Sequence, residues 1–371
     1  MLIGIDGNEA NIKNRVGVGQ YAFNLLKNIY LIDKKNQYII YLKDQPLSDL
    51  PKSRANWHYK VFGPKKLWTK IALPIHLFTQ KEKLDVFYSP SHYSPQFAPC
   101  PTIPTIHDLG YLEFQNQFTK KDLYQLINWT NSSIKKAAHI VTVSNFSKTE
   151  IEKNYQIDPT KITIAYNGVD EPLKIDDKKQ KEILSSYDLI STTYYLYLGT
   201  LKPNKNIPFL IRSFSRFLKK KKINTKLVIA GKKGWLFDEI FSTVKQEKIT
   251  PNIVFTDFVD ESQKWTLYQH AKALILPSTY EGFGIPAIEA MKSNTPVISS
   301  NIAPLKEVVQ NNGFYFNPSN KKELVDQLIN FEKLNSQEIK KITDQAKIRA
   351  DFFTWTNTAK SVISVFEKFN K

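Results

Sequence analysis

The chain has 371 residues, of which 42% are hydrophobic and 13% aromatic, a content that suits two folded domains and excludes a disordered chain. The formal net charge is +17, with the basic residues spread along the sequence rather than gathered in one block. Cys100 is the only cysteine, which excludes an intrachain disulfide and a cysteine-based metal site.

The chain begins with a strand pattern. Residues 1–7 read M-L-I-G-I-D-G, which lacks the charged start and long apolar core of a secretory signal peptide. No apolar run elsewhere reaches the length that spans a bilayer. We therefore expect a cytoplasmic protein, with a peripheral contact to the inner face of the membrane as a further hypothesis.

A polar loop with two glycines follows the first strand and precedes a helix predicted over residues 20–32. Gly17, Gly19 and Ala22 satisfy the spacing G-x-G-x-x-A, which is the fingerprint of dinucleotide-binding sites. That fingerprint must follow its strand directly, and here about ten residues intervene, so we reject a dinucleotide site. Strand and helix patterns then alternate as far as a strand over residues 161–165.

Within this half, a helix predicted over residues 67–80 carries an apolar stripe bordered by lysines. Its apolar positions recur at helical spacing. We hypothesise that this helix contacts an anionic membrane surface, while a helix buried in the domain with solvated ends has the same pattern. The stripe consists of Leu67, Ile71, Ile75 and Phe78, and the lysines are Lys60, Lys65, Lys66, Lys70, Lys81 and Lys83.

His107 and Asp108 follow directly on a strand predicted over residues 102–106. Ligands of open α/β sheets bind beyond the carboxyl ends of the strands. A single histidine is more often structural, but this place at a strand end favours a role for His107 in a ligand site.

The turn N-G-V-D at residues 167–170 interrupts the alternation, and we place the domain boundary there. The predicted domains are 1–170 and 171–352, followed by a helical segment, 353–371. Strands again alternate with helices in the second half, so the fold class is α/β, with two doubly wound parallel-sheet domains of Rossmann type.

The most informative stretch runs from Leu276 to Val297 and is predicted as strand, glycine loop, helix and strand. Gly282 and Gly284 permit a close approach to the backbone. The N–H groups of Phe283 and its neighbours, at the helix N-terminus, suit an anion such as a diphosphate.

Two carboxylates, Glu281 and Glu289, frame this anion site. A phosphate does not favour neighbouring carboxylates, whereas a vicinal diol donates hydrogen bonds to them. A molecule with hydroxyls on both sides of a diphosphate is a nucleotide-sugar. An ordinary βαβ unit with solvent-facing glutamates is the alternative.

Residues 281–289 read E-G-F-G-I-P-A-I-E and resemble the E-x7-E signature of retaining glycosyltransferases of family 4. The resemblance extends over essentially the whole chain. It implies the GT-B fold, in which two Rossmann-like domains face each other across a cleft. The N-terminal domain would serve the acceptor, the C-terminal domain would hold the donor, and the last helix would cross back to the N-terminal domain.

The resemblance also implies roles for single residues. Lys205, in G-T-L-K-P-N-K-N, would bind the donor diphosphate, and Lys202 would replace the family arginine that is absent at Thr200. Glu281 would hold hexose hydroxyls and Glu289 the ribose. The implied catalytic residues are Glu281, His107 and Lys205, and the donor-binding residues are Gly17, Gly19, Lys202, Gly231, Lys232, Phe258, Val259, Gly282, Phe283, Gly284 and Glu289. For Gly231 and Lys232, a turn with solvated lysines is an equally simple interpretation.

No carboxylate pair of the kind that retaining glycosidases use is evident, so the resemblance implies a front-face transfer. No His, Cys or carboxylate cluster has metal-ligand spacing, and we expect no metal or cofactor. The motifs H-D-L and G-K-K-G-W most resemble mannosyltransferases of lipopolysaccharide and capsule assembly. GDP-mannose is the leading donor, and the acceptor is a glycan or a lipid-linked saccharide.

Two other functions remain. A GT-B epimerase or phosphorylase acting on sugar nucleotides shares the fold, although this form of E-x7-E favours transfer. A nucleic-acid-binding protein would suit the charge of +17, but it predicts arginines and aromatics clustered together, which the sequence does not show.

Overall fold

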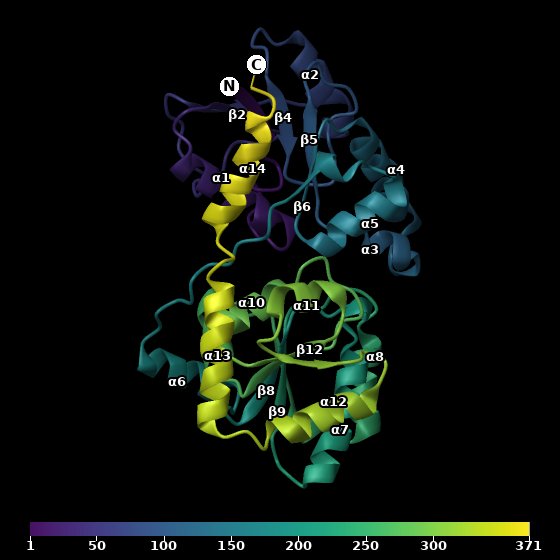
Figure 1. Ribbon diagram of the computed structural model, residues 1–371, viewed down its shortest axis with the longest axis vertical. Coiled ribbons are helices and arrows are strands. Elements are labelled where there is room, and N and C mark those ends of the chain that lie inside the picture. The colour runs from purple at the N-terminus through teal and green to yellow at the C-terminus, as the bar shows by residue number, and fades with distance from the viewer. Residues whose placement is uncertain (371) are drawn as a thin grey trace. The chain divides into compact units, whose positions relative to one another are not determined.

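The computed structural model describes residues 1–370 and divides them into two α/β units (Figure 1). Unit 1 comprises Met1–Gly168 and the segment that begins at Phe353, and unit 2 comprises Val169–Phe352. The structure therefore changes unit two residues before the boundary predicted after residue 170. Each unit is a parallel sheet with helices, as the α/β pattern predicted.

Unit 1 contains a seven-stranded parallel sheet in the order β3-β2-β1-β4-β5-β6-β7. Its central strands are short and mostly buried, and Asp6 is their only charged side chain, as expected for strands that helices cover on both faces. The strands are β1 Leu2–Asp6, β2 Gln37–Leu42, β3 Trp57–Val61, β4 Val86–Ser89, β5 Thr102–Ile106, β6 Ile140–Thr142 and β7 Ile162–Ile164.

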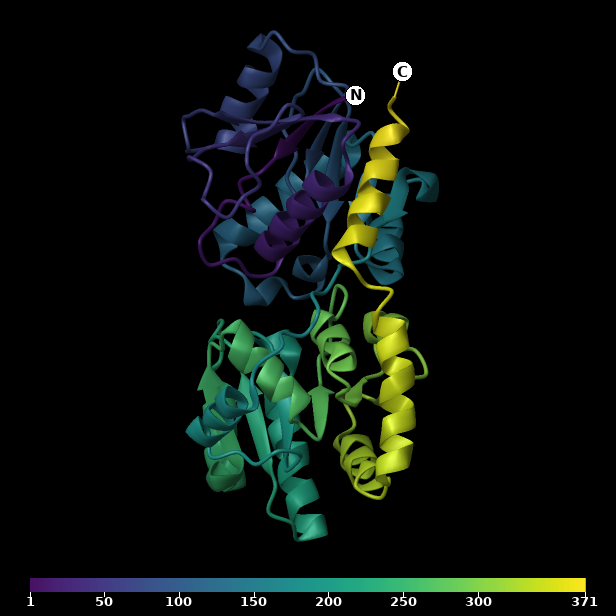
Figure 2. The same cartoon turned by 90° about the vertical axis from the view of Figure 1, so that its left-hand side faces the viewer.

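The last helix of the chain belongs to unit 1 and packs against its first helix (Figure 2). Val362 and Phe366 are fully buried, and Thr356 donates a hydrogen bond of 3.1 Å to Asn28. A side chain at Gly168 would collide with the backbone of Trp355. The crossing of the final helix back to the first domain is thus confirmed. The helices of unit 1 are α1 Val18–Ile32, α2 Leu73–Thr79, α3 Gly110–Glu113, α4 Lys120–Lys136, α5 Asn145–Tyr155 and α14 Trp355–Glu367.

The helix predicted over residues 67–80 consists of a π-helical turn, η1 Trp68–Ala72, followed by α2. Pro74 has no N–H for the carbonyl of Lys70, so the regular α pattern cannot run through this point. Trp68 and Leu77 face the core of unit 1. The apolar stripe points away from that core: its exposed fractions are 46% for Leu67, 46% for Ile71, 59% for Ile75 and 60% for Phe78.

Unit 2 contains a six-stranded parallel sheet in the order β10-β9-β8-β11-β12-β13. Two of its elements were absent from the prediction: the edge strand β13 and the helix α6, which lies in the charged stretch after the boundary. The strands are β8 Tyr194–Leu198, β9 Lys226–Ala230, β10 Ile253–Asp257, β11 Ala273–Leu276, β12 Val297–Ser300 and β13 Phe314–Phe316. The helices are α6 Asp177–Ser186, α7 Ile207–Lys221, α8 Asp238–Glu247, α9 Glu261–Gln269, α10 Ile285–Lys292, α11 Ala303–Val309, α12 Lys321–Phe331 and α13 Ser336–Ala350.

The strand order places a topological switch point in each unit. In unit 2, chain connections diverge on either side of the neighbouring strands β8 and β11, and in unit 1 they diverge beside β1 and β4. In open α/β sheets, ligands bind outside the carboxyl ends of the strands at this point. The loops that follow these four strands are therefore the first places to look for a site.

Candidate active site

The loops that follow β8 and β11 are tied to each other by hydrogen bonds. Asn204 donates from its side chain to the carbonyl of Tyr280 at 3.1 Å, and the N–H of Thr279 donates to the carbonyl of Asn204 at 3.0 Å. Asn206, at the start of α7, donates to the carbonyl of Pro277 at 3.2 Å. The two loops thus form one structure at the switch point of unit 2.

Lys205 and Glu281 meet in this structure. The ammonium of Lys205 lies 2.6 and 2.7 Å from the two carboxylate oxygens of Glu281, and Ser278 donates to Glu281 at 2.7 Å. Only 15% of the Lys205 side chain and 11% of the Glu281 side chain are exposed. Three of the roughly four acceptor positions of the carboxylate are therefore used, and one donor of the ammonium remains.

The predicted glycine loop and helix lie beside this ion pair. Gly284 precedes α10 with a φ of +111°, which favours glycine, and a Cβ there would lie 2.7 Å from Leu305. Phe283 is buried, and Gly282 is partly exposed. The N-terminus of α10 thus has the backbone form that the sequence predicted for an anion site.

Glu289 lies on α10 with both carboxylate oxygens in use. Lys264 donates to Oε1 and Tyr268 donates to Oε2, each at 2.9 Å. Burial lowers the pKa of Lys264, but the carboxylates of Glu289 and Glu261 raise it by more than this, so the pKa lies above its ordinary value. With one donor on each oxygen, Glu289 keeps roughly two acceptor positions, the number that a vicinal diol requires.

The lysines of the two neighbouring loops lie over aromatic rings. The ammonium of Lys202 is 5.4 Å from the ring centre of Trp235, and that of Lys232 is 4.6 Å from Phe258. Phe258 is 60% exposed. A side chain at Gly231 would collide with the carbonyl of Gly199. Gly231 is thus required for packing of the two loops, while the donor roles of these residues, and of Val259 beside Phe258, stay predictions.

In unit 1, His107 lies at the carboxyl end of β5, as predicted. Its ring nitrogen Nε2 is 3.2 Å from the carbonyl of Pro90, which can only accept, so Nε2 carries the proton. Burial and the neighbouring His92 lower the pKa of His107 to about 4. Tyr21 packs edge-on against the ring at 4.7 Å. His107 is therefore held as a neutral imidazole near pH 7.

Gly17 and Gly19 shape the beginning of α1. Gly17 is the residue that precedes the helix and has a φ of +50°. Gly19 is buried, and a Cβ there would lie 3.2 Å from the carbonyl of Glu9. The structure thus gives both glycines a backbone role, and their place beside a ligand stays a prediction.

Four residues of these sites were missed by the sequence analysis. Asp6 ends β1, and burial raises its pKa to about 6 against two hydrogen bonds from Asn8. His92 accepts from the N–H of His107 at 3.0 Å. Lys264 and Tyr268 are four residues apart on α9, a spacing that places them on one helix face. That spacing was a usable signal, but nothing in the sequence indicated that Glu289 is their partner.

The described residues, 1–370, contain neither a cluster of metal ligands nor a helix suited to span a membrane. Within that range, no three His, Cys, Asp or Glu side chains come together as metal ligands, and the expected independence from metals stays a prediction. None of the helices over the same residues has the length and apolar character needed to cross a membrane.

Two protein-family models match the chain. "Glycosyltransferase Family 4" matches residues 17–172, and "Glycosyl transferases group 1" matches residues 180–349. The first match falls in unit 1 apart from its last four residues, and the second lies within unit 2 and includes Lys205, Glu281 and Glu289.

Two curated proteins are similar over much of the sequence. The O-antigen chain mannosyltransferase RfbU of Salmonella typhimurium is 32% identical over 62% of this chain and 60% of its own length. The O-antigen chain mannosyltransferase B of Escherichia coli is 26% identical over 76% of this chain and 74% of its own length. The matched region thus spans about three fifths and three quarters of these relatives.

A solved structure shares the fold. Anabaena HepE, crystallised with UDP-glucose, superposes with a TM-score of 0.74 at 16% identity, over 99% of both chains. At this identity the likeness concerns the fold alone. The two family models together cover most of the chain, so the chain belongs to the glycosyltransferases of group 1 and family 4, and the structural likeness shows that its fold is GT-B.

Proposed function

We propose that the protein is a retaining hexosyltransferase that moves a sugar from a nucleotide-sugar to a glycan or a lipid-linked saccharide. The observation that carries this proposal is the pair of partly satisfied carboxylates at the switch point of unit 2. Glu281 keeps roughly one acceptor position and Glu289 roughly two, and the N-terminus of α10 lies between them in sequence. This arrangement suits hydroxyls on both sides of a diphosphate.

In the proposed reaction, the bond between the anomeric carbon and the donor diphosphate breaks, and a bond from the acceptor oxygen forms on the same face. The acceptor's proton passes to the leaving diphosphate, so a nucleoside diphosphate departs. Lys205 and the N–H groups at the start of α10 stabilise the charge that develops on it. Glu281 stabilises the positive charge that develops on the sugar.

Mannose from GDP-mannose is the proposed donor, because both curated relatives described above bear the name mannosyltransferase. UDP-glucose, the ligand named for HepE, is the main competitor. Thermal unfolding in the presence of single nucleotide-sugars tests the choice, because a ligand at about 100 times its dissociation constant adds about 2.7 kcal/mol to the stability. GDP-mannose should raise the melting temperature most, and a larger rise with a uridine nucleotide-sugar would reassign the donor.

Stereochemistry tests the retaining mechanism directly. Proton NMR of the first product, recorded before anomers equilibrate, should show the same anomeric configuration as the α-linked donor. An inverted product would exclude the front-face transfer. Conversion of the nucleotide-sugar without any acceptor would favour an epimerase instead.

The exposed stripe on η1 and α2 supports the proposed contact with a membrane. Its four apolar side chains lie outside the core, and lysines border them. Two of these lysines are engaged within unit 1, Lys60 by Glu82 and Lys65 by Asp44. Each basic residue near an anionic surface contributes about 1 kcal/mol, and the apolar stripe adds burial.

Vesicle sedimentation tests this contact. The protein should bind vesicles with anionic lipid more strongly than neutral vesicles, and Ile75→Ser with Phe78→Ser should weaken binding at both low and high salt. As a matched control, Ile348→Ser changes an exposed isoleucine of unit 2 and should leave binding unchanged. Equal binding to neutral and anionic vesicles would exclude the electrostatic part of the proposal.

A further inference from the structure

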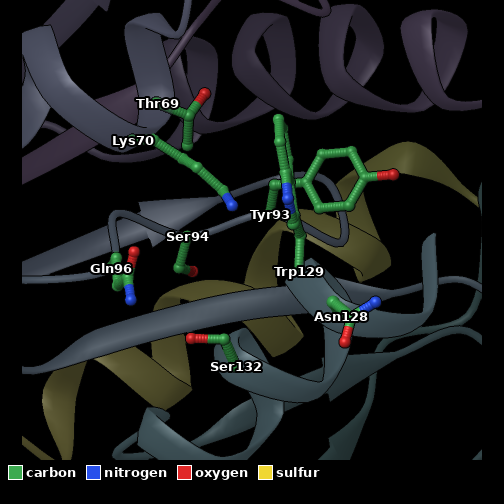
Figure 3. A pocket seen from close by; sticks show the side chains of 8 residues that line it. All are labelled: Thr69, Lys70, Tyr93, Ser94, Gln96, Asn128, Trp129 and Ser132. Atoms are coloured by element: carbon green, nitrogen blue, oxygen red, sulfur yellow. The ribbon is translucent and has the colours of Figure 1, made fainter. Parts of the chain in front are cut away.

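A cavity of about 190 Å³ lies in unit 1, between η1, α4 and the loop that follows β4 (Figure 3). The loop is one of the two that leave the switch point of unit 1. Pockets for larger ligands typically measure about 300–1,000 Å³, so this cavity suits a group the size of one sugar ring. It is lined by Thr69, Lys70, Tyr93, Ser94, Gln96, Asn128, Trp129 and Ser132.

Two aromatic rings form one wall of the cavity. Tyr93 and Trp129 meet edge to face, with 5.5 Å between ring centres and an angle of 73°. The ring of Trp129 faces the pocket in Figure 3. A flat aromatic wall accommodates the C–H face of a sugar ring, because the π face is negative and C–H hydrogens are slightly positive.

Lys70 enters this pocket from η1. Its side chain reaches toward the middle of the labelled residues, and its ammonium is 4.0 Å from the ring centre of Trp129 (Figure 3). Within residues 1–370, no acceptor lies within hydrogen-bonding distance of this ammonium. Burial lowers the pKa of Lys70. A half-buried cation without an anionic partner favours a ligand that supplies one.

Neutral polar groups complete the lining. In the described part of the chain, the hydroxyls of Thr69 and Ser132 and the amide of Gln96 have no partner. The amide nitrogen of Asn128 donates to the carbonyl of Tyr124, which leaves its oxygen available. Hydroxyls and amides in this number are suited to the hydroxyl groups of a saccharide.

We propose that this pocket binds an anionic sugar residue of the acceptor, whose phosphate or carboxylate draws the Lys70 ammonium off the ring of Trp129 and whose own ring takes its place there. The identification of this sugar as part of the acceptor rests on the proposed function, whereas the binding of an anionic sugar does not. Lys70 is on the same turn of η1 as Ile71, a residue of the apolar stripe, so a sugar in the pocket lies next to the surface proposed to meet the membrane.

Direct binding tests the pocket without any donor. Isothermal titration with a hexose 1-phosphate, a hexuronic acid and a neutral methyl hexoside distinguishes phosphate from carboxylate and from the ring alone. At least one anionic sugar should bind at least tenfold more tightly than the methyl hexoside. Inorganic phosphate should bind no better than the methyl hexoside. Equal affinity for all three sugars would overturn the role of Lys70.

Variants test whether the anionic sugar binds in this pocket. Lys70→Met and Trp129→Phe should each weaken binding of the anionic sugar at least fivefold, while Lys34→Met, which removes a lysine over the ring of Tyr30, should not. Lys205→Met should also leave this binding unchanged, which separates the pocket from the donor site. Binding that survives both pocket variants, or that is lost in Lys205→Met alone, would overturn the assignment.

Kinetics separate a failure of this inference from a failure of the proposed function. If the enzyme transfers sugar and Lys70→Met leaves the acceptor KM unchanged, the pocket is not an acceptor site, although the transferase proposal stands. If no nucleotide-sugar is turned over but Lys70→Met abolishes binding of the anionic sugar, the pocket stands and the transferase proposal fails.

Discussion

Near the carboxyl ends of the strands, charged groups are held in opposite ways in the two units. In unit 2, the carboxylates of Glu281 and Glu289 are each paired with a lysine at 2.6–2.9 Å. In unit 1, burial shifts the titratable groups toward their neutral forms: the pKa of Asp6 rises to about 6, and that of His107 falls to about 4. Both sheets have the same strand order over their first six strands, so topology does not cause this difference.

The difference teaches which half of a transfer reaction each unit suits. A diphosphate donor brings charges that need fixed counter-charges, and lysine–carboxylate pairs hold these in place before the donor binds. A saccharide is mostly neutral and is recognised by hydrogen bonds and aromatic surface. The paired charges of unit 2 therefore suit the donor, and the neutral groups and aromatic pocket of unit 1 suit a sugar.

Replacing Lys205, the lysine paired with Glu281 in unit 2, should have the largest effect on turnover. Lys205→Met leaves a partly buried Glu281 beside the diphosphate and removes a donor to the leaving group, so turnover should fall about 10²- to 10³-fold. Lys272→Met is the matched control, because Lys272 forms a 2.6 Å ion pair with Glu332 in the same unit. The control should lower the melting temperature without a comparable loss of turnover per folded molecule.

The sequence predicted the two sheets well because buried parallel strands are apolar runs with clear boundaries. It missed β13, a strand of three residues, and α6, whose charged composition resembles a linker. It located Glu281 and Lys205 but not their contact, because they are 76 residues apart and only the strand order brings their loops together.

The pocket of unit 1 could not be predicted from the sequence. Tyr93 and Trp129 come from a loop and a helix separated by most of a strand–helix unit, and no spacing rule connects them. The apolar stripe was recognised, but its periodicity fits the inside or the outside of a domain equally well. Only the placement of Trp68 and Leu77 in the core decided that the stripe faces solvent.

A buried carboxylate that resists ionisation in unit 1 should cost stability at neutral pH. The folded pKa of Asp6 is about 6, above its ordinary value of 3.8, so stability falls as pH rises from about 4 to above 6. Asp6→Asn removes this cost and can still accept from Asn8. We expect a gain on the order of 2 kcal/mol at pH 7, a melting temperature about 4–8 °C higher, and no gain at pH 3.5.

His107 should make stability depend on pH in the opposite direction. Its folded pKa of about 4 lies below the ordinary 6.5, so below pH 6.5 the unfolded chain takes a proton that the folded chain refuses. Stability should therefore fall as pH decreases from 6.5 to 4, by up to about 3 kcal/mol for this residue. His107→Gln should flatten that part of the curve. An unchanged slope would show that the imidazole is already charged in the folded protein.

Metal removal should have the smallest effect. In the proposed reaction, Lys205 and the N–H groups at the start of α10 stabilise the diphosphate, a role that a divalent cation would otherwise have. Initial rates after dialysis against EDTA should therefore stay within about twofold of the untreated enzyme, a change of about 0.4 kcal/mol in the activation free energy. Restoration of a lost rate by added Mg²⁺ or Mn²⁺ would contradict the prediction.

The central claim is that Glu281 and Glu289 hold different parts of one nucleotide-sugar, and separate measurement of turnover and donor affinity in two variants tests it most directly. The ribose does not change during transfer, so Glu289→Ala should weaken donor binding with little change in kcat. Charge develops on the hexose, so Glu281→Gln should lower kcat more than donor affinity. Each loss should be about 10- to 150-fold, since a hydrogen bond to a charged group contributes about 1.5–3 kcal/mol. If both variants keep kcat and donor dissociation constant within threefold of the parent, the two glutamates do not bind the substrate and the account is wrong.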